Sequence, residues 1–161
     1  LGGSEMCIED SIMTVATFGT KEENVDYVNR YGVYAVIPNS AKDKIILVQA
    51  PNGAWFLPGG EIEAGEDHFL ALERELIEEL GFTATIGEYY GQADEYFYSS
   101  HRDTHYYNPA YIYEVTDFVE AQKPLEDFNN IAWFPIDEAI EKLKRGSHKW
   151  GIKMWKSAQK L

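Results

Sequence analysis

The sequence is poor in cysteine, in basic residues and in long apolar runs. Its single cysteine, Cys7, excludes an intrachain disulfide, and a lone thiol favours a reducing compartment, so we expect a cytoplasmic protein. Lys and Arg number 14 against 27 Asp and Glu, a net charge of −13, which leaves no basic surface for duplex nucleic acid. The first residues lack an apolar run of the kind found in signal peptides, so we expect neither a leader nor a membrane partner.

Length and composition predict a folded domain. The 161 residues fit the usual size of one domain, about 100 to 200 residues. Apolar residues make up 45% of the chain and aromatic residues 14%, which supplies a sizeable core. We therefore expect one domain over residues 13–161, preceded by an N-terminal extension over residues 1–12. Within that extension, residues 1–5 precede Met6 and are interpreted as an addition or an upstream extension.

Runs of β-branched and aromatic residues alternate with helical patterns along the chain. Strands are predicted at 13–18, 31–37, 44–50, 83–90, 95–99, 110–118 and 131–134, and helices at 66–80, 137–144 and 148–160. The second and third strands flank a turn-forming segment, 38–43, and are predicted to form a hairpin. Asp137 is the predicted N-cap of its helix. This interleaving favours a layered α/β fold around a mixed sheet.

The helix predicted at 66–80 is strongly acidic. Its apolar positions Phe69, Leu72, Leu76 and Leu80, extended by Leu70 and Ile77, share one face, while Glu75, Glu78 and Glu79 share another. Like charges at this spacing cost a helix about 0.2 to 0.5 kcal/mol per pair, and a bound divalent cation would reverse that cost. The alternative interpretation is an ordinary solvated acidic face. Glycines before the helix, at 59–60, and after it, at 81, fit turns that hold both of its ends.

The residues Gly60, Glu66 and the run Arg74-Glu75-Leu76-Ile77-Glu78-Glu79-Leu80-Gly81-Phe82 resemble a complete Nudix box. Only Phe82 departs from it, because an aliphatic residue is more common there. The resemblance implies the Nudix-type α/β/α sandwich, with a mixed β-sheet and a loop-helix-loop box. It also implies a hydrolase that cleaves a nucleoside diphosphate linked to another moiety, using Mg²⁺ or, as a substitute, Mn²⁺.

The resemblance also implies roles for individual residues. The expected metal ligands are the carboxylates of Glu75 and Glu79, the Gly59 carbonyl, and Glu78 either directly or through water. Arg74 would orient the glutamates. The general base is predicted to be Glu75 or Glu78, with the later residues Glu120, Glu126 and Asp127 as alternatives. Glu66 is interpreted as a partner for Arg74, with a metal role as the alternative.

Three residues outside the box are candidate substrate contacts. Trp55, close to the box, is predicted to stack on a base, and Arg102 to hold a phosphate or carboxylate, with an ordinary loop role as its alternative. Tyr96 and Tyr98 lie roughly where a subgroup acting on dinucleoside polyphosphates carries a tyrosine, and Tyr98 is the candidate contact. A dinucleoside polyphosphate or a nucleoside triphosphate is therefore the favoured substrate. The alternative function is a catalytically silent Nudix-fold module that senses a nucleotide or binds a protein, and a homodimer is expected by family analogy.

Overall fold

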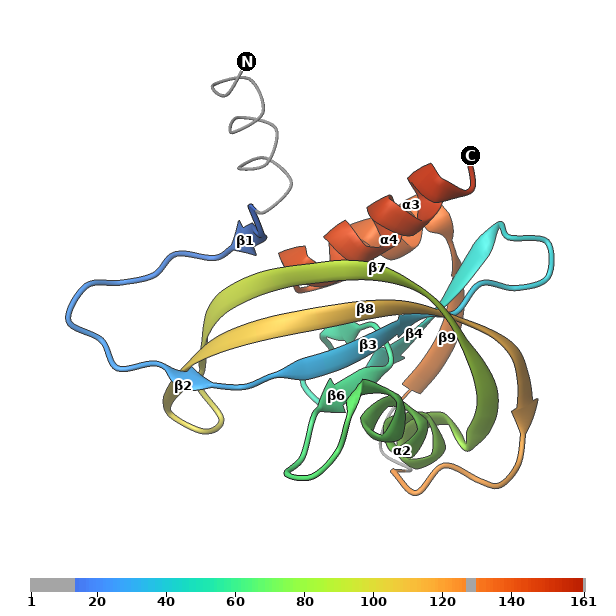
Figure 1. The fold of residues 1–161 in the computed structure, drawn as a ribbon, viewed down its shortest axis with the longest axis horizontal. Helices are drawn as coiled ribbons and strands as arrows, with labels where there is room; N and C mark the ends of the chain where they lie inside the picture. Colours follow the sequence, from blue (N-terminus) through green and yellow to red (C-terminus); the bar gives the residue numbers. More distant parts are fainter. Residues whose placement is uncertain (1–13, 127–129, 161) are drawn as a thin grey trace, which may run out of the picture.

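The computed structural model describes residues 14–126 and 130–160, which form two sheets flanked by helices (Figure 1). The larger sheet contains β1 (Ala16–Phe18), β2 (Val28–Asn29), β3 (Gly32–Val36), β6 (Gly59–Glu61), β7 (Phe82–Ser99) and β8 (Thr104–Glu120). Its order is β1-β7-β8-β3-β6, with β2 also beside β8. Strand β1 runs parallel to β7, and β3 runs parallel to β8. Strands β7 and β8 run antiparallel to each other, so the sheet is mixed as predicted.

The smaller sheet and the helices complete the layers. Strand β4 (Lys44–Gln49) pairs antiparallel with β5 (Trp55–Phe56) and with β9 (Asn130–Pro135). Helix α2 (His68–Leu80) lies on one side of the large sheet, and α3 (Ile136–Lys142) and α4 (Gly146–Ala158) lie on the other (Figure 1). The predicted layered α/β fold is confirmed. Among the described residues, no helix is long and apolar enough to cross a membrane.

The predicted hairpin between the second and third strands is wrong beyond its turn. Asn39 closes that turn, because its amide nitrogen donates to the Lys44 carbonyl and its side chain accepts from the Asp43 and Lys44 amides. After one bridge, between Pro38 and Ile45, the strands part into different sheets. Both are almost fully buried, and each has two other strands as neighbours. The predicted strands 83–90 and 95–99 are continuous in β7, which bends through irregular pairing near Gly91.

The core forms two clusters, one on each face of the large sheet. Strand β3 shows the alternation that separates them, because Val33 and Ala35 pack toward α2 while Tyr34 and Val36 pack toward α4. Trp155 of α4 is fully buried in the second cluster. Burying one large apolar side chain stabilises a fold by about 1.5 to 3 kcal/mol, so both helices are held firmly on the sheet.

The buried stripe of α2 differs from the predicted one. Its buried residues are Ala71, Leu72, Leu76 and Leu80, whereas Phe69 is 47% and Leu70 55% exposed. The helix is turned so that the row containing Glu75 and Glu79 faces strand β6, which draws Phe69 and Leu70 away from the core. Gly81 ends the helix at φ 71°, as predicted for a glycine past the last turn.

The start of α3 also differs from the prediction. Pro135 occupies the N-cap position, and Asp137 lies inside the first turn with no capping hydrogen bond. There its carboxylate interacts favourably with the helix dipole and forms an ion pair with Lys156 of α4, at 3.0 Å.

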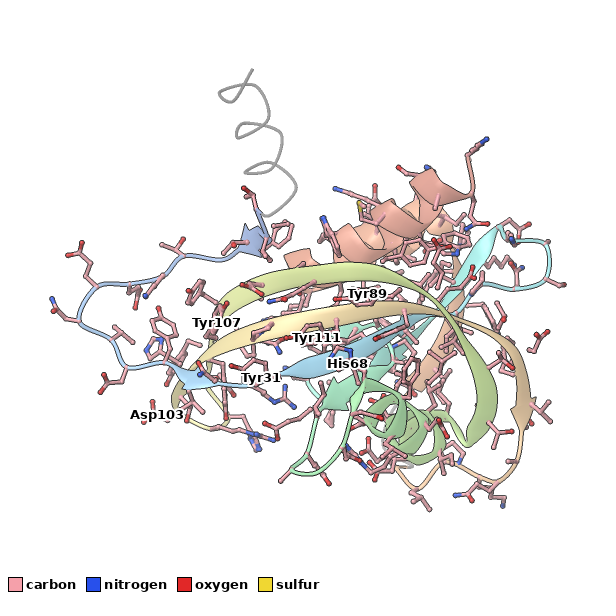
Figure 2. The ribbon with its side chains drawn as sticks, viewed as in Figure 1. Tyr31, His68, Tyr89, Asp103, Tyr107 and Tyr111 are labelled. Carbon is pink, nitrogen blue, oxygen red and sulfur yellow. The ribbon has the colours of Figure 1, made fainter. Side chains whose placement is uncertain are left out.

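Tyrosines lie along the large sheet, from Tyr107 near β2 to Tyr111 and Tyr89 nearer α2 (Figure 2). Tyr107 donates its hydroxyl proton to Asp94, and the ring of Tyr111 lies 4.3 Å from that of His68. His68 also forms a hydrogen bond of 2.8 Å with the Tyr113 hydroxyl. These side chains contact and hydrogen-bond with one another, so packing explains most of the tyrosines of β7 and β8.

Candidate active site

The site begins where strand β6 passes Glu75 and Glu79, the glutamates of α2 that face it. Gly59 has φ 140°, and a Cβ there would lie 2.1 Å from the Val33 carbonyl oxygen. A Cβ on Gly60 would lie 2.5 Å from Glu75 Oε1. Glycine is therefore required at position 59, which lies against the β3 backbone, whereas a side chain at position 60 would displace the Glu75 carboxylate of α2.

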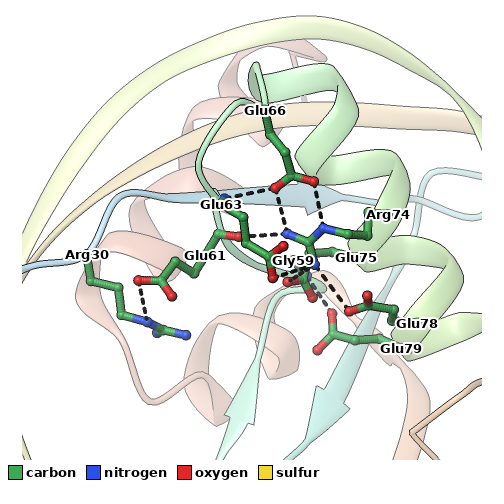
Figure 3. A network of polar contacts seen from close by, with 9 residues as sticks. All are labelled: Arg30, Gly59, Glu61, Glu63, Glu66, Arg74, Glu75, Glu78 and Glu79. Carbon is green, nitrogen blue, oxygen red and sulfur yellow. Dashed lines mark hydrogen bonds and ion pairs between the residues drawn. The ribbon is translucent and has the colours of Figure 1, made fainter.

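Arg74 organises the acidic side chains around this strand (Figure 3). Its Nε and Nη2 donate to both oxygens of Glu66, at 2.7 and 2.9 Å, and Nη2 also donates to the Glu61 carbonyl. Its Nη1 donates to Glu75 at 3.0 Å and to Glu78 at 3.2 Å. The hydrogen bonds from Arg74 lower the pKa of Glu66 to about 2. The guanidinium is thus fully engaged by the chain, which fixes two of the candidate metal ligands.

Burial shifts the pKa values of Glu75 and Glu79, the two glutamates of α2 that face β6. It raises the pKa of Glu79 well above its usual range, although the Gly59 amide donates to Glu79 at 2.7 Å. Burial also raises the pKa of Glu75, against the opposing effect of Arg74. The charges of Glu78 and Glu126 add to both shifts. Crowded carboxylates with this deficit of positive charge fit a divalent cation, whose preferred ligands are oxygens.

The carboxylates are not already arranged around an ion. Among residues 14–126 and 130–160, no three Asp, Glu, His or Cys side chains are grouped as a metal site. Glu75 and Glu78 instead accept from Arg74, and Glu79 accepts from Gly59. The donor set therefore fits Mg²⁺ by its chemistry, and these side chains would have to turn from their present partners to bind it.

A cavity of about 340 Å³ opens beside these residues. Gly59, Gly60 and Glu79 line one part of it, and the remaining lining is aromatic, aliphatic, polar and cationic: Arg30, Tyr34, Val48, Ala50, Phe56, Leu57, Phe97, Ser99, Arg102, Tyr106, Asn108, Arg145 and His148. This volume lies within the range of small-molecule sites, about 300 to 1,000 Å³. One cavity thus joins a carboxylate end to a cationic, aromatic end.

A family model described as the NUDIX domain matches residues 28–155. The chain belongs to the Nudix family. Escherichia coli CTP pyrophosphohydrolase is 49% identical over 51 residues, 29% of this chain and 38% of that protein. A human diphosphoinositol polyphosphate phosphohydrolase is 28% identical over 109 residues, 64% of this chain and 56% of that protein. The matched part of the chain therefore spans 38% of the first relative and 56% of the second.

Solved Nudix structures have the same fold. The ORF135 protein of E. coli has a TM-score of 0.63 at 25% identity, covering 83% of this chain and 92% of that one. A NUDIX hydrolase from Nitrosomonas europaea has a TM-score of 0.62 at 25% identity, covering 81% and 90%. These similarities confirm the family and the fold that the box predicted.

Helix α2, which carries the Nudix box, is called the Nudix helix. The three predicted substrate contacts lie in different places. Arg102 lines the cavity. Trp55 is not among the lining residues, and its ring packs edge-on against Phe134, 4.9 Å away. Tyr98 is also outside the lining, is 49% exposed and donates its hydroxyl proton to Asp103.

Both displaced aromatics are one residue from a side chain that does line the cavity. Phe56 follows Trp55, and Phe97 precedes Tyr98. Successive side chains of a strand point to opposite faces, so Trp55 and Tyr98 lie on the other face of their strands from Phe56 and Phe97, and their contact with substrate stays a prediction. Arg30 and Arg145 were missed as well. Their one sequence signal is that they are cations in a strongly acidic chain.

The three alternative general bases lie at different distances along the chain from the Nudix helix, and of the two within the described residues one is held beside it. The amides of Leu125 and Glu126 both donate to the Glu78 carbonyl, at 2.9 and 3.1 Å, which holds Glu126 beside the Nudix helix. Glu120 instead pairs across from Phe82, past the end of that helix. Asp127 lies outside the described residues.

Proposed function

We propose that this chain is a metal-dependent Nudix hydrolase that cleaves a phosphoanhydride bond in a nucleoside diphosphate linked to another moiety. A dinucleoside polyphosphate or a nucleoside triphosphate is the favoured substrate. The observation that carries this proposal is a cavity lined by Gly59, Gly60 and the Nudix carboxylate Glu79 and also by cationic and aromatic side chains. The names of the relatives, a CTP pyrophosphohydrolase and a diphosphoinositol polyphosphate phosphohydrolase, agree with this class of reaction.

The proposed cofactor is Mg²⁺, with Mn²⁺ as a substitute. The carboxylates of Glu75, Glu78 and Glu79 and the Gly59 carbonyl would hold it. When bound, the cation neutralises charge on the phosphoryl oxygens and lowers the pKa of a bound water. An anionic substrate would otherwise be repelled by a protein of net charge −13.

In the proposed reaction, water attacks a phosphorus atom in line with the phosphate that leaves. The new oxygen–phosphorus bond forms as the phosphoanhydride bond breaks, and a carboxylate takes the proton of the attacking water. Glu75 or Glu78 is the proposed base, and Glu126, held against the Nudix helix, is the alternative. Arg74 positions Glu75 and Glu78 through its two hydrogen bonds from Nη1.

The test is hydrolysis of nucleoside triphosphates, dinucleoside polyphosphates, nucleotide sugars, ADP-ribose and NADH, with and without Mg²⁺. We expect metal-dependent turnover in the wild type and a loss of orders of magnitude in Glu79→Gln. Glu73→Gln is the matched control, because Glu73 is an exposed acid on the same helix and lies outside the cavity lining. Equal activity in Glu79→Gln and the control would overturn the assignment of Glu79.

The alternative function gives a different result. No turnover, together with a Mg²⁺-dependent rise in melting temperature that Glu79→Gln abolishes, would favour a nucleotide-sensing module over an enzyme. A specific metal at 100 times its dissociation constant adds about 2.7 kcal/mol when only the folded state binds it. A melting curve unchanged by Mg²⁺ would contradict the metal ligands themselves.

We also propose a cytoplasmic location and a homodimer. The single cysteine supports the first, since it suits a reducing compartment. Light scattering of the purified chain tests the second, and a monomeric mass at micromolar concentration would contradict it.

A further inference from the structure

The cavity contains three arginines that are paired very differently from Arg74. Arg74 donates to three carboxylates at 2.7 to 3.2 Å. In the described part of the chain, by contrast, neither Arg102 nor Arg145 forms an ion pair, and the pair of Arg30 with Glu61 is long, at 3.9 Å. A chain with 27 acidic residues thus leaves the cations of its cavity with little negative charge.

Arg30 is held by its backbone and not by its side chain. Its amide donates to the Tyr107 carbonyl at 2.8 Å, and its own carbonyl accepts from the Asn108 side chain. Its Nε is buried and has no hydrogen-bond partner among the described residues. A buried donor without a partner costs free energy, which a ligand in the cavity would recover.

Arg145 lies on aromatic rings next to Arg30. Its guanidinium carbon is 3.5 Å from the centre of the Phe97 ring, a position that fixes the planar group without using its donors. Burial lowers the pKa of Arg145; the charge of Glu95 opposes this shift, and the charge of Arg30 adds a smaller lowering, so the two cations repel each other at this end of the cavity. The Glu95 carboxylate accepts from the Ser147 amide at 2.9 Å, and its charge partly offsets that of Arg145, although the two form no ion pair among the described residues.

We propose that the substrate carries a phosphate monoester in addition to the diphosphate that is cleaved, and that Arg30 and Arg145 bind this second phosphate. A simple nucleoside triphosphate or dinucleoside polyphosphate has no such group, so a phosphorylated nucleoside diphosphate derivative replaces those two favoured substrates. A dianionic group offsets two guanidinium charges at once and accepts hydrogen bonds from both planar forks. Arg102, at the exposed rim, adds a third donor group on the same side. The identity of the cleaved bond rests on the proposed function, whereas the binding of the second phosphate does not.

A guanine edge is the competing ligand, because arginine binds its two acceptors well. It is the weaker explanation here. A neutral base occupies one fork and leaves the repulsion between Arg30 and Arg145 in place. The same two charges also lower the pKa of His148, so all three groups lie together and the local charge is positive.

Calorimetry can test the second phosphate directly. AMP, adenosine 2′,5′-bisphosphate, adenosine 3′,5′-bisphosphate and GMP have no phosphoanhydride bond, so their binding is measurable in the presence of Mg²⁺ without turnover. We expect one bisphosphate to bind the wild type at least about tenfold more tightly than AMP. In Arg145→Gln and in Arg30→Gln this ratio should fall close to one while the Kd of AMP changes little. Lys153→Gln, which removes an exposed cation outside the cavity, should keep the ratio.

The opposite results would overturn the inference. These are bisphosphates that bind no more tightly than AMP, variants that weaken all four ligands equally, or a preference for GMP over AMP that Arg145→Gln removes. Melting temperatures of the variants establish that each is folded. If Arg145→Gln does not fold, Arg30→Gln decides the question alone.

Hydrolysis separates this inference from the proposed function. The matched pairs are coenzyme A against dephospho-coenzyme A and NADPH against NADH, with kcat/KM compared within each pair. Bisphosphate selectivity without any hydrolysis would refute the enzyme and leave the phosphate site intact. Hydrolysis with no preference for the phosphorylated member of either pair, together with equal binding of AMP and the bisphosphates, would refute the phosphate site and leave the enzyme intact.

Discussion

His148 should make the stability of this protein depend on pH. Its side chain is fully buried, and Nδ1 accepts from the Leu57 amide at 3.1 Å, which requires an unprotonated nitrogen. Burial lowers the pKa of His148 to about 3, with Arg145 and Arg30 adding to the shift. The unfolded chain takes up the proton near pH 6.5 and the folded chain does not. The stabilisation is therefore present above pH 6.5 and is lost as the pH falls from 6.5 toward 3.

The size of the effect follows from the shift. One unit of pKa corresponds to about 1.36 kcal/mol, so between pH 7 and pH 5 this histidine should cost the protein about 2 kcal/mol of unfolding free energy. Urea unfolding at the two pH values measures it. The comparison protein is His148→Asn, because its side-chain oxygen keeps an acceptor near the Nδ1 position and does not titrate in this range.

The wild type should lose about 2 kcal/mol more than His148→Asn over this interval. Contributions from other titrating groups are common to both proteins and cancel in the difference. Equal losses in the two proteins would refute the reasoning, since they would mean that His148 is protonated as easily in the folded chain as in the unfolded one. A cooperative transition of the variant at pH 7 is the control for its fold.

Three further predictions concern the site and the core. Glu79→Gln should melt at a higher temperature than the wild type at pH 7 without Mg²⁺, because burial raises the pKa of Glu79 and its charged form is the costly one; a lower melting temperature would contradict this. Gly60→Ala should lower turnover at least tenfold with a modest loss of stability, since its Cβ would displace Glu75; unchanged kinetics would contradict that contact. Leu72→Ala should cost about 2 to 5 kcal/mol in urea unfolding, because the side chain is fully buried, and a cost under 1 kcal/mol would contradict its packing.

The carboxylate end of the site could be predicted from sequence because its parts are local. Gly59 and Gly60 belong to strand β6, and Glu75 and Glu79 to the helix that follows it, so the spacing of the motif fixes their relative positions. The same helix also shows the limit of periodicity. Its apolar pattern included Phe69, yet the inner row is occupied by glutamates, because the site takes part of the surface that a simple amphipathic helix would give to the core.

The cationic end could not be predicted in the same way. Arg30, Phe97 and Arg145 come from three distant parts of the chain, and only the strand register and the docking of α4 bring them together. The face of the strand on which a residue lies was also not visible in the sequence. Trp55 was predicted from its closeness to the box and Tyr98 from the position of a tyrosine in a family subgroup, whereas the face that each residue takes depends on pairing with the other strands.

The parallel pairing of distant strands has a consequence for how the protein reaches this structure. Gly32 pairs with Ala110, and Ala16 with Ala93, so much of the large sheet depends on contacts between remote segments, which slow folding. The loop and helix that carry the carboxylates are contiguous and can form early. The arginine end requires the parallel ladder to close first. During folding, the carboxylate end of the cavity should therefore take shape before the arginine end.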